Sequence, residues 1–127
     1  MRIYPFFLVI LMFIGLAGCA KKADSAKITE ANQLITKGEY EKGLEFLDQM
    51  AKESPKDEIL LKERIAGHMK FANYLRDESP LPPKEKYPAA LAQYRIVYQL
   101  DPNNADAKNN IGLIEGIYKQ MGRTVPN

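Results

Sequence analysis

The chain has 127 residues, of which 27% are charged and 46% are hydrophobic, and its formal net charge is +2. This length allows one domain, and this composition is typical of a folded globular protein rather than a disordered one. So small a net charge gives no support to a nucleic-acid partner, and none is expected.

Residues 1–18 have the pattern of an export signal. Arg2 supplies a positive charge, and residues 6–17 form an apolar run that is too short to span a bilayer comfortably. The run ends in Leu16-Ala17-Gly18-Cys19, which resembles the lipobox of bacterial lipoproteins. The resemblance implies cleavage before Cys19 and attachment of a diacylglyceryl group to its thiol. Ordinary secretion and an uncleaved anchor are the alternatives.

The single cysteine fits this interpretation. Cys19 is the only cysteine of the chain, so the sequence predicts no disulfide and no thiolate metal site. Residues 19–25 would then be a lipidated tether in the mature protein. Ala20, rather than aspartate, follows the cysteine. By the same resemblance, this implies the periplasmic face of the outer membrane if the host is Gram-negative.

Five helices are expected in the rest of the chain. Four of them lie at about 25–37, 40–52, 55–77 and 102–121, and the fourth in order has Pro88 in its first turn and runs to about residue 99. Apolar residues recur in them at helical spacing. In the last helix, the residues expected to form the packed stripe are Ile111, Ile114, Tyr118 and Met121. Ser54 and Asp101 are expected to cap the third and fifth helices, because each precedes a proline that suits the first helical position. Residues 78–86 hold three prolines and are expected to form an exposed loop. Residues 123–127 are a tail.

One pattern occurs twice, 47 residues apart: a small residue, large apolar residues four and seven positions later, and a proline twelve positions later. Its members are Gly43, Leu47, Met50 and Pro55, and then Ala90, Tyr94, Val97 and Pro102. Over about residues 26–122 the chain resembles the tetratricopeptide repeat (TPR) family. The resemblance implies an all-α domain of two antiparallel helix hairpins and a C-terminal capping helix, arranged as a short right-handed superhelical array. The family's usual repeat is 34 residues, which indicates an insertion at about 78–86 together with an extended third helix.

The resemblance also implies where a partner would bind, because the first helix of each pair lines the concave face in this family. The matching positions are Ile28, Asn32, Ile35 and Thr36 in the first helix, and Lys62, Ala66, Met69 and Lys70 in the third. Ile28 stands where the family's carboxylate clamp has lysine, so that activity is not expected. A second candidate surface is the last helix, where Leu113 and Ile117 share a face and could pack on a copy of the chain or on another subunit.

The sequence offers no catalytic constellation. His68 is the only histidine, and we expect it to be packed or to line a groove rather than to bind zinc or act in catalysis. We therefore expect no enzyme activity, no metal and no cofactor. The expected function is a membrane-anchored protein–protein interaction module, an adaptor or assembly factor in the bacterial cell envelope. The alternatives are a small-ligand carrier or accessory subunit of an envelope enzyme complex, with residues 78–86 as its lid, and a structural part of a stable complex.

Overall fold

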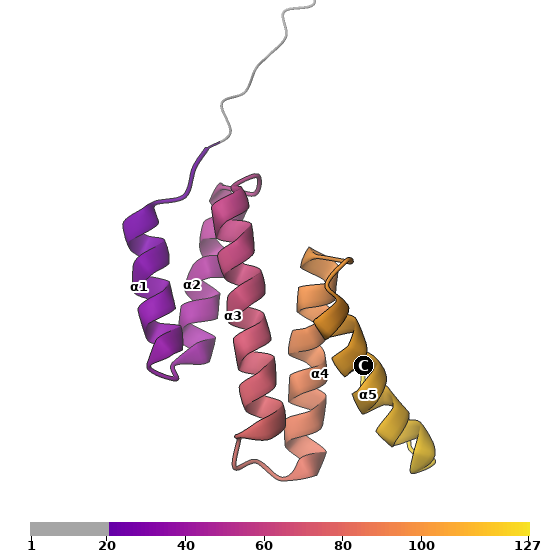
Figure 1. Ribbon diagram of the computed structural model, residues 1–127. Coiled ribbons are helices and arrows are strands. Elements are labelled where there is room, and N and C mark those ends of the chain that lie inside the picture. The colour runs from indigo at the N-terminus through magenta and orange to yellow at the C-terminus, as the bar shows by residue number, and fades with distance from the viewer. Residues whose placement is uncertain (1–20) are drawn as a thin grey trace, which may run out of the picture.

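The computed structural model describes residues 21–127, and within that range it contains five helices and no strand. The helices are α1 (Ser25–Thr36), α2 (Tyr40–Glu53), α3 (Glu58–Asp77), α4 (Pro83–Leu100) and α5 (Ala105–Gln120) (Figure 1). The all-α prediction is therefore confirmed. The predicted export signal and Cys19 lie outside the described residues. In the part that is described, no helix is both long enough and apolar enough to cross a bilayer.

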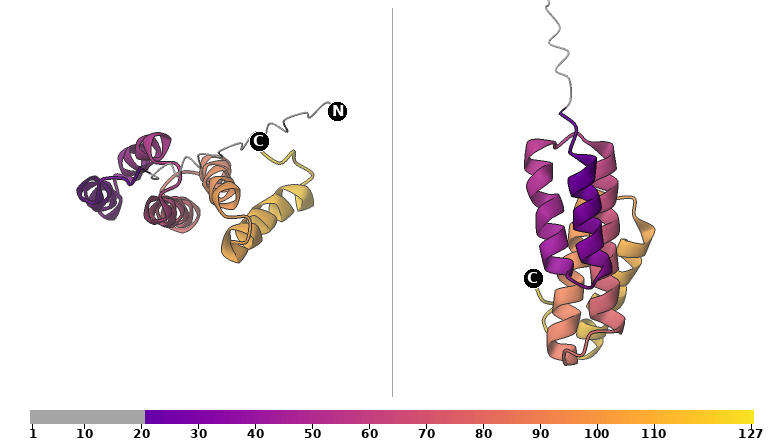
Figure 2. Two further views of the ribbon diagram at one scale, coloured as in Figure 1. Left: turned by 90° about the horizontal axis from the view of Figure 1, so that it is seen from above. Right: turned by 90° about the vertical axis from the view of Figure 1, so that its left-hand side faces the viewer.

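Consecutive helices run antiparallel and pack against each other along the chain (Figure 1). Seen from above, they form two layers, with α1, α3 and α5 in one and α2 and α4 in the other (Figure 2). Direct contacts also join α1 to α3 within the first layer. α5 packs on α4 and is inclined to the other four helices (Figures 1 and 2).

Two groups of buried apolar residues hold the layers together. The first group joins α1, α2 and the start of α3, and its members are Ile28, Ala31, Ile35, Leu44, Leu47 and Leu60. The second joins the end of α3 to α4 and α5, and its members are Ala72, Leu75, Ala90, Leu91, Tyr94 and Ile114. Phe71 packs against both groups and so connects them into one core.

Gly43, the small residue of the first copy of the repeated pattern, lies where two helices approach each other closely. A Cβ atom at Gly43 would come within 2.7 Å of the backbone oxygen of Ala31 and within 2.6 Å of Cγ1 of Ile35. Because a backbone oxygen cannot move without shifting its helix, α1 and α2 can meet here only when α2 carries no side chain. A Cβ at Gly112 in α5, by contrast, would meet nothing within 4 Å.

Two matched glycine substitutions therefore have opposite expected effects. Gly112→Ala should stabilise the fold by about 0.5–1 kcal/mol, because alanine favours a helix interior over glycine. Gly43→Ala gains the same helix propensity but forces α1 and α2 apart, so we expect a net loss of stability, with overpacking costing about 1–3 kcal/mol. Thermal unfolding followed by circular dichroism checks both. Equal shifts of the melting temperature in the two variants would contradict the close approach of α1 and α2.

The predicted caps of the third and fifth helices are wrong by three residues. The N-cap of α3 is Asp57, which accepts hydrogen bonds from the backbone N–H groups of Ile59 and Leu60 at 2.9 and 3.0 Å. Ser54 instead ends α2, and its carbonyl accepts from the N–H of Asp57 across a turn that contains Pro55. The proline thus occupies a turn position, which its fixed φ suits equally well. The backbone N–H groups of Leu60, Ala23 and Ile59 lower the pKa of the Asp57 carboxyl.

The same arrangement occurs at the second proline. Asn104 is the N-cap of α5 and accepts from the N–H of Ala107 at 2.9 Å. Asp101 ends α4, and its side chain accepts from the N–H of Asn103 within the turn. Each of the two segments that contain a proline thus has two residues able to cap a helix, and the later residue, Asp57 or Asn104, is the N-cap in the structure.

The proline-rich segment is more helical than expected. α4 begins at Pro83 rather than near Pro88, so the connection from α3 is shortened to residues 78–82. Pro83 takes the first helical position, where its missing N–H costs nothing. Pro88 lies inside the helix, at the cost of one backbone hydrogen bond.

The second hairpin is longer than the first. α3 and α4 have 20 and 18 residues, whereas α1 and α2 have 12 and 14. The end of α3 and the start of α4 therefore extend beyond the turn between α1 and α2, which contains Gly38 at φ +86° (Figure 1). This overhang forms a step between the two hairpins, on the end of the domain opposite to the start of α1.

Candidate functional site

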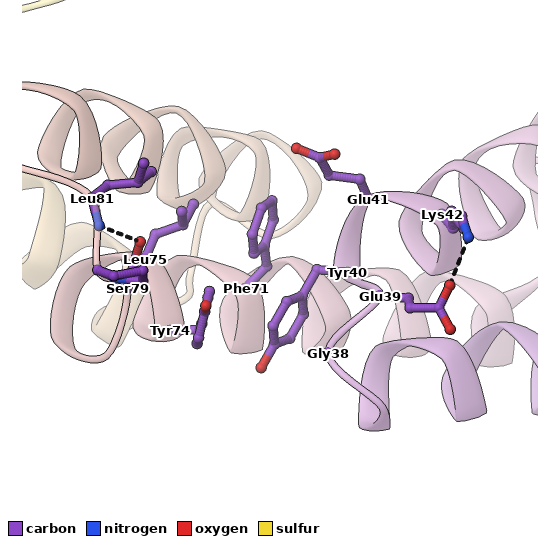
Figure 3. Close-up of a pocket in the computed structure, with 11 residues that line it drawn as sticks. Gly38, Glu39, Tyr40, Glu41, Lys42, Phe71, Tyr74, Leu75, Ser79 and Leu81 are labelled. Carbon is purple, nitrogen blue, oxygen red and sulfur yellow. Dashed lines mark hydrogen bonds and ion pairs between the residues drawn. The ribbon is translucent and has the colours of Figure 1, made fainter.

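A pocket of about 440 Å³ lies at this step. Its walls come from three segments that are distant in sequence: residues 38–42 at the start of α2, the end of α3, and the connection after α3 (Figure 3). The lining residues are Gly38, Glu39, Tyr40, Glu41, Lys42, Phe71, Tyr74, Leu75, Ser79, Pro80 and Leu81. We call this hollow the step pocket.

Three aromatic rings form the floor of the step pocket. The ring of Tyr40 stacks on the rings of Phe71 and Tyr74, with centroid separations of 5.0 Å and interplanar angles of 13° and 29° (Figure 3). Phe71 and Tyr74 are three residues apart on α3, so both face the start of α2. All three side chains are partly buried. Burial, followed by the nearby carboxylate of Glu78, raises the pKa of the Tyr40 hydroxyl.

The mouth of the step pocket combines charge with one exposed leucine. Lys42 Nζ donates to Glu39 Oε2 at 2.7 Å, and this hydrogen bond lowers the pKa of Glu39 and raises that of Lys42. Leu81 is 40% exposed although it is large and apolar. Its N–H donates to Oγ of the buried Ser79, and the N–H of Ser79 donates to the carbonyl of Tyr74 at 2.9 Å, which holds the connection against the end of α3. The pocket is thus apolar inside and charged on one side of its rim.

Two of the residues predicted to bind a partner belong to the core. Ile28 and Ile35 are 7% and 4% exposed and pack in the first buried group between α1, α2 and α3. Their prediction as surface residues is wrong, because α1 turns this apolar stripe toward α2. Asn32 lies on the adjacent face, partly buried, and its Nδ2 donates to Glu63 Oε2 of α3 at 2.8 Å.

The remaining residues predicted to bind a partner lie on α1, α3 and α5, and none of them lines the step pocket. Thr36, Lys62, Ala66 and Lys70 are exposed on α1 and α3, and Met69 is partly buried against the second group. Leu113 is 57% exposed on α5, and Ile117 is partly buried. That these residues bind a partner stays a prediction.

The C-terminal tail folds back on the domain without covering Leu113. Val125 packs against the second buried group, and the carbonyl of Pro126 accepts a hydrogen bond of 2.7 Å from Arg95 of α4. Met121 is 56% exposed, so its prediction as a packed residue of the last helix is wrong. The helix ends at Gln120, one residue earlier, and the side chain of Val125 packs against this core from the tail.

His68 is buried among polar groups of three helices. Its Nδ1 is 2.8 Å from Gln93 Oε1 of α4, and its Nε2 is 3.6 Å from Asp48 Oδ2 of α2. Arg64 Nε donates to the other oxygen of Asp48 at 2.7 Å. Among the described residues, no three histidine, cysteine or acidic side chains are placed to hold a metal ion.

Sequence reasoning did not predict the step pocket as a site. In the sequence, Phe71 and Tyr74 have the spacing of ordinary residues of a helical stripe, and Tyr40 stands three residues before the small residue of the repeated pattern. The extra length expected for the third helix is the signal that could have indicated the pocket. A helix that extends beyond the helix packed against it leaves its last side chains uncovered, and here these include aromatic residues.

Comparison with known proteins gives no relative: no protein-family model, no curated protein and no solved structure matches this chain.

Proposed function

We propose that the chain is a protein–protein interaction module, an adaptor or assembly factor that a lipid on Cys19 anchors in the bacterial cell envelope. The observation that carries the proposal is the step pocket, whose stacked aromatic floor and exposed Leu81 offer an apolar side chain of a partner a place to be buried. A TPR-like right-handed array is part of the proposal. It is supported by the two helix layers, the close approach at Gly43 and the prolines in both turns.

The test of the binding site compares two exposed leucines. Leu81→Asp places a charge at the mouth of the step pocket, whereas Leu113→Asp makes the same change on α5, and both side chains are exposed enough for the fold to tolerate the change. We expect a stoichiometric partner, isolated from detergent-solubilised membranes with the wild type, to be lost with Leu81→Asp and retained with Leu113→Asp. The opposite result would move the interface to α5, and retention by both variants would contradict a site at either surface.

The anchor has its own prediction. Wild-type protein should incorporate labelled palmitate and partition into detergent, because two or more acyl chains bind a membrane stably. Cys19→Ser should abolish the incorporation, since serine has no thiol to form the thioether. Mass spectrometry of the mature protein checks the lipid directly. A water-soluble wild-type mature chain without acyl groups would contradict the lipobox interpretation.

One observation favours a second candidate function, that of a small-ligand carrier. The volume of the step pocket, about 440 Å³, falls within the range of about 300–1,000 Å³ found for small-molecule sites. Native mass spectrometry of the protein released from its membrane separates the two functions. A bound small molecule that Tyr74→Ala removes would favour the carrier.

A further inference from the structure

A second hollow, of about 360 Å³, lies between α2 and α4 with α3 as its floor. Glu41 and Phe71 line both this hollow and the step pocket, so the two hollows lie next to each other and are together called the trough. The step pocket is the aromatic end of the trough. We call the other end, lined by Glu45, Asp48, His68 and Gln93 among others, the acidic hollow.

The wall that α2 contributes is negatively charged. Glu41, Glu45 and Asp48 follow one another at spacings of four and three residues, and so lie on one face of the helix. Arg64 compensates the charge of Asp48, and Lys52 lines one end of the hollow. Within the described part of the chain, neither Glu41 nor Glu45 takes part in an ion pair. The hollow therefore carries an excess of negative charge.

A buried nitrogen at the floor lacks a hydrogen-bond partner. His68 is 3% exposed, and its Nε2 is the buried side-chain atom without a partner among the described residues. Gln93 Oε1 is an acceptor, so the proton of a neutral imidazole lies on Nδ1, and Nε2 presents a lone pair. Asp48 Oδ2, a second acceptor, faces it at 3.6 Å. A buried acceptor without a donor is costly, and a positively charged N–H donor drawn to Asp48, whose side chain is 39% exposed, would lie close to it.

We propose that the acidic hollow receives a basic side chain, an arginine or a lysine, of the same partner segment whose apolar side chain fills the step pocket. This inference rests on the proposed function and specifies the partner: an apolar residue followed closely along the chain by a basic one. Arginine suits the hollow best, because its guanidinium carries several N–H donors in a fixed plane that can serve more than one carboxylate oxygen of the wall that α2 contributes.

The test uses four kinds of short, acetylated and amidated peptides against the full chain in detergent micelles, without a histidine tag. One kind carries phenylalanine followed by arginine, the second replaces arginine by glutamine, the third replaces phenylalanine by serine, and the fourth has both replacements. Each kind is made with one, two or three residues between the two positions. Because His68 is the only histidine of the chain and lines the acidic hollow but not the step pocket, its imidazole proton signals in NMR report binding at the acidic hollow.

We expect the peptide with both phenylalanine and arginine to shift the His68 signals and to bind most tightly. Loss of arginine should weaken binding by about tenfold, the effect of one buried charge-assisted hydrogen bond. If the glutamine peptides bind as well as the arginine peptides, the acidic hollow has no such role although the step pocket keeps its own. If serine in place of phenylalanine changes nothing, the proposed function at the step pocket fails instead.

Matched variants of the protein locate the effect. Glu45→Gln removes an exposed charge of the hollow, and Glu30→Gln removes an exposed charge on α1 outside both pockets. The preference for arginine over glutamine should fall in Glu45→Gln and stay unchanged in Glu30→Gln. Equal falls in both variants would mean that the preference reflects overall charge, and would overturn the proposal.

Discussion

Replacing Tyr94 by alanine should lower the free energy of unfolding by about 3–5 kcal/mol. The side chain is fully buried in the second group of core residues, and its hydroxyl donates to Asn73 Oδ1 at 2.7 Å. Arg76 lies over the ring, 5.9 Å from its centroid. Because domains of this size are stable by only about 5–15 kcal/mol, the loss should be plain in the thermal unfolding curve.

Tyr94→Phe is the control for this prediction. It keeps the ring and removes one hydrogen bond, so we expect a loss of about 1 kcal/mol. Asn73 is exposed, and its amide can therefore turn to water when the hydroxyl is gone. If the alanine variant were no less stable than the phenylalanine variant, the ring would not fill the space between α3, α4 and α5.

Leu47→Ala should cost about 2–5 kcal/mol, because it opens a cavity in the first group of core residues. Leu47 is fully buried, whereas Leu61 on α3 is 37% exposed. Leu61→Ala makes the same chemical change at that exposed position, where we expect a change within about 0.5 kcal/mol. Denaturant unfolding of the two variants gives the comparison, and similar losses would contradict the burial of Leu47.

The two core substitutions also test whether the hairpins unfold together. Phe71 packs against both buried groups, and α2 of the first hairpin contacts α3 of the second. We therefore expect Tyr94→Ala and Leu47→Ala each to shift a single unfolding transition. Two separate transitions in either variant would show that the hairpins are independent units.

The helices could be predicted because the periodicity of apolar residues is a local property of the sequence. Ala31, Leu47, Leu91 and Ile114 follow helical spacing and are buried. The errors at the caps have a local cause as well. Ser54 and Asp57, like Asp101 and Asn104, offer two capping side chains within four residues, and propensity alone does not choose between them.

The candidate site could not be predicted because it depends on distances between elements. The step pocket exists because α3 and α4 extend beyond α2, which brings Tyr40 opposite Phe71 and Tyr74. The family resemblance placed Ile28 and Ile35 on an open face. In the structure both residues belong to the apolar stripe that α1 buries in the core. The acidic hollow likewise joins residues of three helices.

The most direct test of an interaction site at the step pocket is photocrosslinking in intact cells. A benzoylphenylalanine placed at Leu81 lies at the mouth of the pocket, and the same group at Glu30 lies on the exposed side of α1. We predict one adduct of defined mass with an envelope protein from position 81 and no such adduct from position 30. The absence of a protein adduct at 81, or the same adducts from both positions, would contradict a partner-binding site at the step.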